Sequence, residues 1–491
     1  MRPRLRTVGA WYCGLVFALV CVRGSEAGPP PPAPVGAVPS PRQLAWQELG
    51  YYGFLHFTVN TFTDREWGLG DERPEVFAPT ALDARQWARV AREAGMAGLI
   101  LTVKHHDGFC LWPSRYTDHS VKSSPWRGGR GDVVGELATA CRALGLKLGL
   151  YLSPWDRNHA EYGRPAYLDY YRRQLRELLT QYGPLFEVWF DGANGGDGYY
   201  GGARDKRQID GATYYGWPAT WGLVRELQPN AVMFSDAGPD VRWVGNENGL
   251  GFETAWMPID LARIYPGSPD YMPLAGGRPD GADWAPPEVD VSIRPGWFYH
   301  PSEDDKVKTV DDLIEIYYAS LGRSANLLLN VPPDRRGLIH ETDAERLRGL
   351  RRFVDATFAT NFARGARATA TAVRGSAPEF AASNAIDGNP ATYWATDDGV
   401  TTGALELTLA RPARFDQVAV REAVALGQRV EEWAIEAEVD GAWRTLARGT
   451  TMGIRRILRF PLVSASRVRV VIARARACPA IAEVGLHLSA R

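Results

Sequence analysis

The sequence predicts two domains, an α/β (β/α)8-like barrel over residues 43–362 and a β-sandwich over residues 363–491. Between residues 43 and 330, short apolar runs alternate with amphipathic stretches of helical period, as in a parallel sheet covered by helices. After residue 365 the helical period disappears, and short runs separated by turns indicate a β-sandwich. The length of 491 residues leaves room for two or three domains.

Eight apolar runs are candidates for the eight barrel strands. They span residues 52–57, 98–103, 147–152, 185–191, 231–235, 251–256, 296–300 and 325–331. The first four are evenly spaced, whereas the sixth and seventh lie in a less regular part of the chain. Five further runs are candidate strands of the C-terminal domain, at residues 404–409, 417–422, 432–438, 454–460 and 467–472.

Amphipathic stretches between the barrel runs predict the helices that cover the barrel. They span residues 83–94, 132–144, 168–182, 219–227 and 310–321, and one more follows at 341–356. Asp83, Asp132 and Asp311 stand near three predicted helix starts, where an acidic side chain can cap free backbone N–H groups.

The N-terminus has the pattern of a secretory signal peptide. A basic head is followed by an apolar stretch over residues 8–22 and by a small-residue site before Gly28, which predicts cleavage after residue 27 and export of the mature chain, secreted or periplasmic. The apolar stretch is too short to favour a membrane span. Residues 28–42 are rich in proline and predict a disordered or polyproline linker.

Composition narrows the choice of partner and cofactor. The formal net charge is −1, from 56 basic and 57 acidic side chains, so no overall field draws the chain to nucleic acid or an anionic membrane. The mature chain keeps Cys110, Cys141 and Cys478 without a CxxC or Cys/His pattern of zinc spacing, and we expect no metal and no cofactor. The 17 Trp, 20 Tyr and 17 Phe suit both core packing and the stacking of sugar rings.

Polar side chains follow each of the first four predicted strands. His56 ends the first, His105 and His106 follow the second, Tyr151 lies in the third and Asp191 ends the fourth. Because the carboxyl ends of parallel barrel strands meet at one rim, we expect these side chains to lie close together. His105 and His106 are not a metal signature, because adjacent strand residues point to opposite faces unless the backbone bends. Asp191 by itself suits a nucleophile, a metal ligand or a cap.

Cleavage of a glycosidic bond requires a carboxylate near the anomeric carbon and an acid that protonates the leaving oxygen. Asp191 suits the first role. For the second role, Glu247 lies on a Gly/Asn-rich stretch after the fifth predicted strand, and Glu253 and Asp236 are rivals. The chemistry of the three acids does not choose among them.

Six motifs in order resemble glycoside hydrolase family 29, the α-L-fucosidases, over residues 43–354. They are FLHF at 54–57, EWG at 66–68, HHDGFCLW at 105–112, LYLSPW at 150–155, VWFDG at 188–192 and NLLLNVPPD at 326–334. The resemblance implies a retaining hydrolase on a (β/α)8-like barrel, with Asp191 as nucleophile. The positions implied to hold the fucose are His56, Glu66, Trp67, His105, His106, Tyr151 and Trp189.

The string RWVGNE at 242–247 looks like the branch of this family that acts on α-1,3/4-linked fucose, and Glu247 matches the acid/base of that branch. The expected substrate is therefore terminal fucose on a branched oligosaccharide or glycoconjugate. Two alternatives are a fucosidase of broad linkage preference and a non-catalytic fucose-binding protein on the same fold.

The segment at 385–394 resembles the discoidin-like, coagulation-factor C-type domains, many of which bind sugars. Gln428, Arg429 and Trp443 fit the version of that domain that is often appended to these fucosidases. Two roles for the C-terminal domain stay open at this point, glycan binding and buttressing of the barrel.

Overall fold

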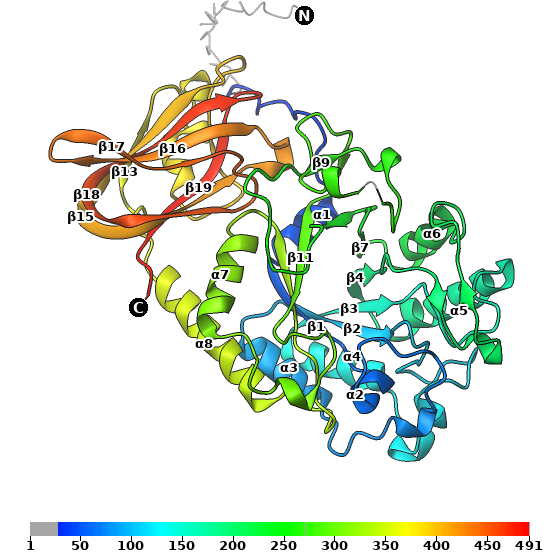
Figure 1. The fold of residues 1–491 in the computed structure, drawn as a ribbon. Coiled ribbons are helices and arrows are strands. Elements are labelled where there is room, and N and C mark those ends of the chain that lie inside the picture. Colours follow the sequence, from blue (N-terminus) through cyan, green and yellow to red (C-terminus); the bar gives the residue numbers. More distant parts are fainter. Residues whose placement is uncertain (1–27, 270, 491) are drawn as a thin grey trace, which may run out of the picture.

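The computed structural model describes residues 28–269 and 271–490. The predicted signal peptide lies outside the described residues. The described chain forms a helix-covered barrel, followed by an antiparallel sheet domain beside it (Figure 1). Among the described residues, no helix combines the length and the apolar character that crossing a membrane requires.

Eight parallel strands close the barrel in the order β1-β12-β11-β8-β7-β4-β3-β2. The strands are β1 (Tyr51–Leu55), β2 (Gly98–Lys104), β3 (Lys147–Leu152), β4 (Leu185–Trp189), β7 (Val232–Ser235), β8 (Val241–Trp243), β11 (Pro287–Ser292) and β12 (Asn326–Asn330). Two small antiparallel pairs sit in the loops, β5 (Gly196–Asp197) with β6 (Lys206–Arg207), and β9 (Pro258–Ile259) with β10 (Asp283–Trp284).

The sixth and seventh predicted strands, 251–256 and 296–300, are wrong. The barrel uses β8 and β11 in their place, and residues 251–256 and 296–300 lie in loops. β8 has three residues and includes the charged Arg242, and β11 carries Glu288 and Asp290. Because these charged residues interrupt both strands, neither strand has the apolar run that marks a buried strand in a sequence. All three charged side chains are nevertheless buried.

The predicted helices are present, with small shifts at their ends. They are α3 (Ala84–Glu93), α4 (Val133–Leu144), α5 (Pro165–Gln181), α6 (Trp217–Leu227), α7 (Val310–Ser320) and α8 (Glu341–Phe358). Asp83 and Asp132 cap α3 and α4 as predicted. The expected cap Asp311 is wrong, because Thr309 and Asp312 form a reciprocal capping box at the start of α7.

Two short helices were not predicted. α2 (Val59–Thr63) follows β1, and α1 (Pro41–Gln47) begins at the capping residue Ser40. Trp46 of α1 packs into the barrel interior with Tyr52, at the start of β1. α1 therefore covers the end of the barrel opposite the carboxyl ends of the strands.

The C-terminal domain has a seven-stranded antiparallel sheet around its own core. Its strands are β13 (Arg367–Ala370), β14 (Trp394–Ala395), β15 (Gly403–Glu422), β16 (Val430–Val439), β17 (Ala442–Gly449), β18 (Arg456–Ala475) and β19 (Ala480–His487). The predicted pair 404–409 and 417–422 is the single strand β15, and the predicted pair 454–460 and 467–472 falls almost entirely on β18. In both strands a shift of register separates the two halves, because a polar stretch interrupts the apolar pattern without ending the strand.

Residues 28–40 have no helix or strand, but they do not form a free linker. Arg429 Nη2 donates to the carbonyl of Ala33 at 2.6 Å, and Arg374 Nε donates to that of Pro30 at 2.6 Å. The N–H of Val35 bonds the carbonyl of Leu426 at 3.0 Å. The segment therefore packs against the C-terminal domain before the chain enters α1 (Figure 1).

Candidate active site

A cavity of about 380 Å³ opens at the carboxyl ends of the barrel strands. The nine side chains expected as nucleophile, acid/base and fucose contacts all line it: His56, Glu66, Trp67, His105, His106, Tyr151, Trp189, Asp191 and Glu247. They come from the ends of four strands and from the loops after β1 and β8, so the fold gathers them from nearly 200 positions of the sequence. The cavity has the size of a small-ligand site.

Asp191 lies two residues after the end of β4 and is held by two hydrogen-bond donors. The backbone N–H of Ala193 bonds Oδ1 at 2.6 Å, and the hydroxyl of Tyr151 bonds Oδ2 at 3.1 Å. Burial raises the pKa of Asp191 to about 6, while the two donors oppose that shift. No helix begins at this residue, so Asp191 is not a helix cap. Within the described chain, no group of three His, Cys, Asp or Glu side chains is placed to hold a metal ion.

Glu247 lies on the loop after β8, and its side chain lines the same cavity as Asp191. The indole Nε1 of Trp297 donates to its Oε2 at 3.1 Å. Burial raises the pKa of Glu247, and the charges of Asp191 and Glu66 raise it further. A raised pKa favours the protonated form of a carboxyl group, which is the form that a general acid uses.

Trp297 was missed in the sequence because residues 296–300 were assigned to a strand. Its backbone N–H and that of Phe298 donate to the Glu66 carboxylate at 2.8 and 3.0 Å, and His300 Nε2 lies 2.7 Å from Glu66 Oε1. Glu66 therefore anchors the loop that presents the Trp297 ring. That ring lies 5.2 Å from the ring of His56, centroid to centroid, and forms one wall of the cavity.

Three buried histidines form another wall, and their partners determine which ring nitrogen carries a proton. Asn330 donates its amide N–H groups to Ser292 and Trp297, so its carbonyl oxygen accepts from Nδ1–H of His56 at 2.9 Å. Ser153 gives its hydroxyl proton to the carbonyl of Trp155 and so accepts from Nδ1–H of His106 at 2.7 Å. Nε2 of His56 and of His106 is then an acceptor for a sugar hydroxyl.

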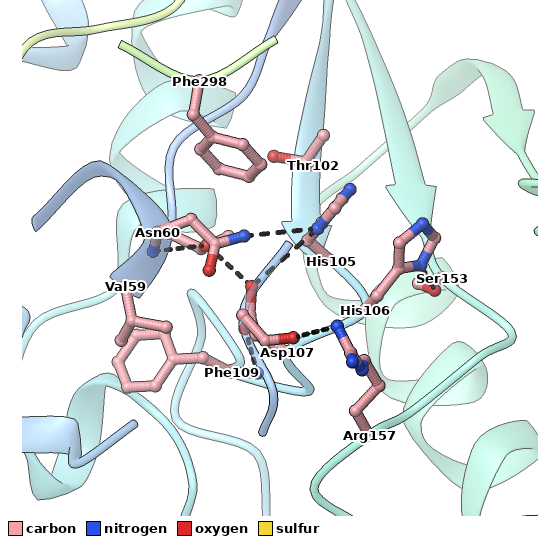
Figure 2. Close-up of polar contacts among 12 residues, drawn as sticks. Val59, Asn60, Thr102, His105, His106, Asp107, Phe109, Ser153, Arg157 and Phe298 are labelled. Atoms are coloured by element: carbon pink, nitrogen blue, oxygen red, sulfur yellow. Dashed lines mark hydrogen bonds and ion pairs between the residues drawn. The ribbon is translucent and has the colours of Figure 1, made fainter. Parts of the chain in front are cut away.

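His105 has the opposite tautomer. Asn60 Nδ2 donates to the carbonyl of Glu66 at 3.2 Å, which orients the amide, and the same nitrogen lies 3.4 Å from Nδ1 of His105 (Figure 2). We therefore assign Nδ1 of His105 as the acceptor and its Nε2–H as a donor. Burial lowers the pKa of His56 and His106 to about 3 and that of His105 well below its ordinary value, so all three rings are neutral. Both acceptors and a donor are therefore available for hydroxyl groups.

His105 and His106 both face the cavity, because the backbone leaves the strand before them. β2 ends at Lys104, so both histidines lie in the turn that follows the strand and are free of its alternation. Their ring centroids are 4.1 Å apart, and both rings line the cavity.

Aromatic rings form the floor and the rim of the cavity. Trp189 stacks on Phe234 with centroids 4.1 Å apart and on Tyr151 at 5.2 Å. Trp67 lies at the rim with 51% of its surface exposed, edge-on to His106. Apolar faces opposite buried polar groups suit a ligand that has hydroxyls on one side and a hydrocarbon face on the other.

The two rivals of Glu247 have different positions. Glu253 does not line the cavity, because Arg323 and Arg456 pair with its carboxylate outside it. Asp236 does line the cavity, and the N–H of Gly267 donates to its Oδ2 at 2.7 Å. Burial raises the pKa of Asp236 to about 7.

One further acid in the cavity was not singled out in the sequence. Asp290 of β11 lines the cavity and accepts a hydrogen bond from Trp243 Nε1 at 2.7 Å, and burial raises its pKa well above the ordinary value. An alternating pattern over 287–292 is the signal that identifies this strand, since Glu288, Asp290 and Ser292 occupy every second position.

Comparison with known proteins identifies both domains. Residues 45–357 match the α-L-fucosidase family model, and residues 367–484 match the F5/8 type C domain. A putative α-L-fucosidase 1 of Oryza sativa subsp. japonica is 46% identical over 98% of this chain and 92% of its own length. α-L-Fucosidase 1 of Arabidopsis thaliana is 43% identical over 94% of this chain and 89% of its own.

Solved structures agree with the sequence relatives. A glycoside hydrolase 29 family member from an unknown rumen bacterium has a TM-score of 0.83 and 43% identity, covering 93% of this chain and 78% of its own. A Ruminococcus gnavus GH29 fucosidase in complex with fucose has a TM-score of 0.84 and 31% identity, covering 95% and 97%. The barrel, its cavity and these relatives lead to one conclusion: the chain belongs to the α-L-fucosidases, glycoside hydrolase family 29, and carries an F5/8 type C domain after its catalytic barrel.

Proposed function

We propose that this fucosidase is a retaining exo-hydrolase of terminal α-1,3/1,4-linked fucose, with Asp191 as nucleophile and Glu247 as acid/base. The observation that carries the proposal is that both carboxyl groups line one cavity but have different partners. Asp191 accepts two hydrogen bonds that favour its ionised form. Glu247 has a pKa raised by burial and by neighbouring negative charge. The two acids are thus prepared for the two different tasks of a retaining mechanism.

The first step joins fucose to the protein. An oxygen of the Asp191 carboxylate attacks the anomeric carbon as the bond to the glycosidic oxygen breaks, and Glu247 gives its proton to that leaving oxygen. The products are a fucosyl ester of Asp191 and the free aglycone. In the second step the Glu247 carboxylate takes a proton from water, the water oxygen attacks the anomeric carbon, and the ester bond to Asp191 breaks. Two inversions leave the configuration unchanged.

The histidines and aromatic rings bind the sugar while this happens. Nε2 of His56 and of His106 accepts from sugar hydroxyls, and Nε2–H of His105 donates to one. Because these rings are neutral, they bind hydroxyls without adding a charge that would oppose the positive charge developing at the anomeric carbon. The Trp189 and Trp297 rings cover the apolar face of fucose, including its methyl group.

Trapping the covalent intermediate tests the mechanism. A 2-deoxy-2-fluoro-fucosyl donor with a good leaving group forms the ester but hydrolyses it slowly. Digestion and mass spectrometry should place the adduct on the peptide that contains Asp191, and proton NMR of a normal turnover should show α-L-fucose as the first product. An adduct on another peptide, or β-L-fucose as the first product, contradicts the proposal.

Linkage preference needs a separate assay. The string at 242–247, which resembles the α-1,3/4 branch, motivates this part of the proposal. An enzyme of that branch prefers a Lewis-type trisaccharide to a simple aryl fucoside, because contacts with the neighbouring galactose add to transition-state binding. Equal rates on α-1,2-, α-1,3- and α-1,6-linked fucosides would instead support a fucosidase of broad linkage preference. Fucose binding without turnover supports the non-catalytic alternative.

Export of the enzyme is part of the same proposal, and it rests on the leader pattern of residues 1–27. Sequencing the N-terminus of the mature protein after expression in its own host tests it. A chain that starts near Gly28 supports export, and an uncleaved chain that stays inside the cell contradicts it.

A further inference from the structure

The loop that carries Glu247 continues directly into the contact with the C-terminal domain. After Glu247 the chain passes Gly251 and reaches residues 253–257, which lie against the F5/8 type C domain (Figure 1). We name residues 253–257 the anchor segment. Five residues separate its first member, Glu253, from Glu247.

Side chains of the C-terminal domain hold the backbone of the anchor segment at both of its ends. The Gln428 amide bonds it twice, as Nε2 donates to the carbonyl of Ala255 at 2.8 Å and Oε1 accepts from the N–H of Met257 at 2.9 Å. Thr451 Oγ1 accepts from the N–H of Ala255 at 3.0 Å, and Thr450 Oγ1 donates to the carbonyl of Glu253 at 3.1 Å. These bonds satisfy backbone N–H and C=O groups of a segment that belongs to no helix or strand.

The contact is buried and includes charge and apolar packing. Gln428 is 1% exposed and Thr451 is 2% exposed. Arg456, 3% exposed, pairs with the carboxylate of Glu253. An apolar cluster lies around these polar groups and takes members from both domains: Ala255, Met257 and Trp284 from the barrel, and Val424 and Ile454 from the sheet domain.

Near the cavity the same loop has few attachments. Asn246 closes a turn by bonding Leu250, and Asn248 forms a single bridge to Val291 of β11. Within the described chain, Trp297 Nε1 is the one hydrogen-bond donor to the Glu247 carboxylate. Between Glu247 and the anchor segment the barrel holds Gly251, whose N–H donates to the carbonyl of Ala319 at 2.8 Å and whose carbonyl accepts from Arg323 Nη1 at 2.8 Å. Arg323 also pairs with Glu253, so Gly251 and the anchor segment together fix where the loop that carries Glu247 returns to the fold.

We propose that the F5/8 type C domain positions the acid/base, with Gln428 and Thr451 as positioning residues that act on Glu247 through the anchor segment. The inference rests on the proposed role of Glu247. It gives the C-terminal domain a buttressing role that has a consequence for catalysis, and it is independent of whether that domain also binds glycans. A misplaced acid fails to protonate a poor leaving group but is not needed for a leaving group that departs as an anion.

The test uses the full-length enzyme and a series of aryl fucosides whose leaving groups span a wide range of pKa. Gln428→Ala and Thr451→Val should lower kcat/KM about tenfold for the poorest leaving groups and leave the 2,4-dinitrophenyl fucoside within about twofold of wild type. Thr451→Ser keeps the hydroxyl and should restore the wild-type dependence. Arg459→Ala is the matched control, because Arg459 pairs with Glu315 at 2.6 Å on the same domain contact but away from the anchor segment. It should not change the dependence on leaving group.

Outcomes against the inference are distinct from outcomes against the function. If Gln428→Ala lowers kcat/KM equally for all aryl fucosides, the anchor segment does not position the acid. The same conclusion follows if Arg459→Ala lowers kcat/KM selectively for the poorest leaving groups. If Glu247→Ala itself shows no selectivity for leaving group, the assignment of the acid/base fails first. Should Thr451→Val not fold, Gln428→Ala and Thr451→Ser still separate these cases, with thermal unfolding measured for each variant.

Discussion

Asp191 and Glu247 share a cavity but are held in two different ways. Asp191 lies two residues after the end of β4 and is held by the N–H of Ala193 and by Tyr151 of the neighbouring strand β3. Glu247 lies on a loop after the shortest barrel strand and has one indole donor, and the same loop runs on to the contact with the C-terminal domain. In the proposed mechanism, the barrel itself positions the nucleophile, whereas contacts with the second domain help to position the acid/base. The contrast teaches that a carboxylate beside a barrel strand is held by the strands, whereas one on a long loop takes its place from what that loop contacts.

Removing the nucleophile should have the largest effect. Asp191→Ala should lower turnover by roughly 10³- to 10⁵-fold on every fucoside, because the covalent path is lost regardless of the leaving group. Steady-state kinetics on an aryl fucoside and a trisaccharide measure it. The isosteric Asp191→Asn should lose activity to a similar extent. Both variants should have a thermal unfolding midpoint at or above that of the wild type, because each removes a buried acid. Near-normal hydrolysis by either variant contradicts the assignment.

Removing the acid/base should give a large effect that depends on the substrate. Glu247→Ala should lose roughly 10²- to 10⁴-fold on oligosaccharides, whose leaving oxygen needs a proton. Formation of the fucosyl ester from a 2,4-dinitrophenyl fucoside should be nearly unchanged, measured as a pre-steady-state burst.

Glu253→Ala is the control for that experiment, because Glu253 is also a carboxylate of this loop but pairs with arginines outside the cavity. Glu253→Ala should not produce the pre-steady-state burst that we expect for Glu247→Ala on the 2,4-dinitrophenyl fucoside. A selective effect of Glu253→Ala equal to that of Glu247→Ala contradicts the contrast drawn between the two acids.

Changing pH should separate the two groups in the wild-type enzyme. The Asp191 carboxylate must be ionised to attack, and burial raises its pKa to about 6. Activity is therefore complete above that value and is lost as pH falls through it, so kcat/KM at pH 5 should be about tenfold below the plateau. The other limb, at higher pH, reports loss of the Glu247 proton. An acidic limb near pH 4 contradicts the raised pKa of Asp191.

Removing the indole donor should have the smallest effect. Trp297→Phe keeps a ring at the cavity wall but deletes the N–H bond to Glu247. That bond stabilises the charged form, so its loss should raise the pKa of Glu247 and move the basic limb of the pH profile upward. We expect kcat/KM for poor leaving groups to fall severalfold. A basic limb that moves to lower pH contradicts the assigned partner.

How far the sequence predicts this molecule differs between its regions. The first four barrel strands were predicted because their apolar runs are long and end in polar residues. β8 and β11 were not, because Arg242, Glu288 and Asp290 interrupt the apolar pattern and become acceptable only once the barrel supplies their partners. The same error concealed Asp290 and Trp297, since a wrong strand at 296–300 left the true strand and the wall loop unrecognised.

By itself, the sequence determined the local pattern: a barrel of alternating runs and helices, a β domain after it, the caps at Asp83 and Asp132, and nine polar and aromatic residues at strand ends and loops. The tertiary structure decided which of these meet. It brought Glu247 to the cavity and paired Glu253 with Arg323 and Arg456, although both acids lie on one loop of similar composition. The physical reason is that hydrophobic periodicity is a local property, whereas the partners of a buried charge come from distant segments and exist only after folding.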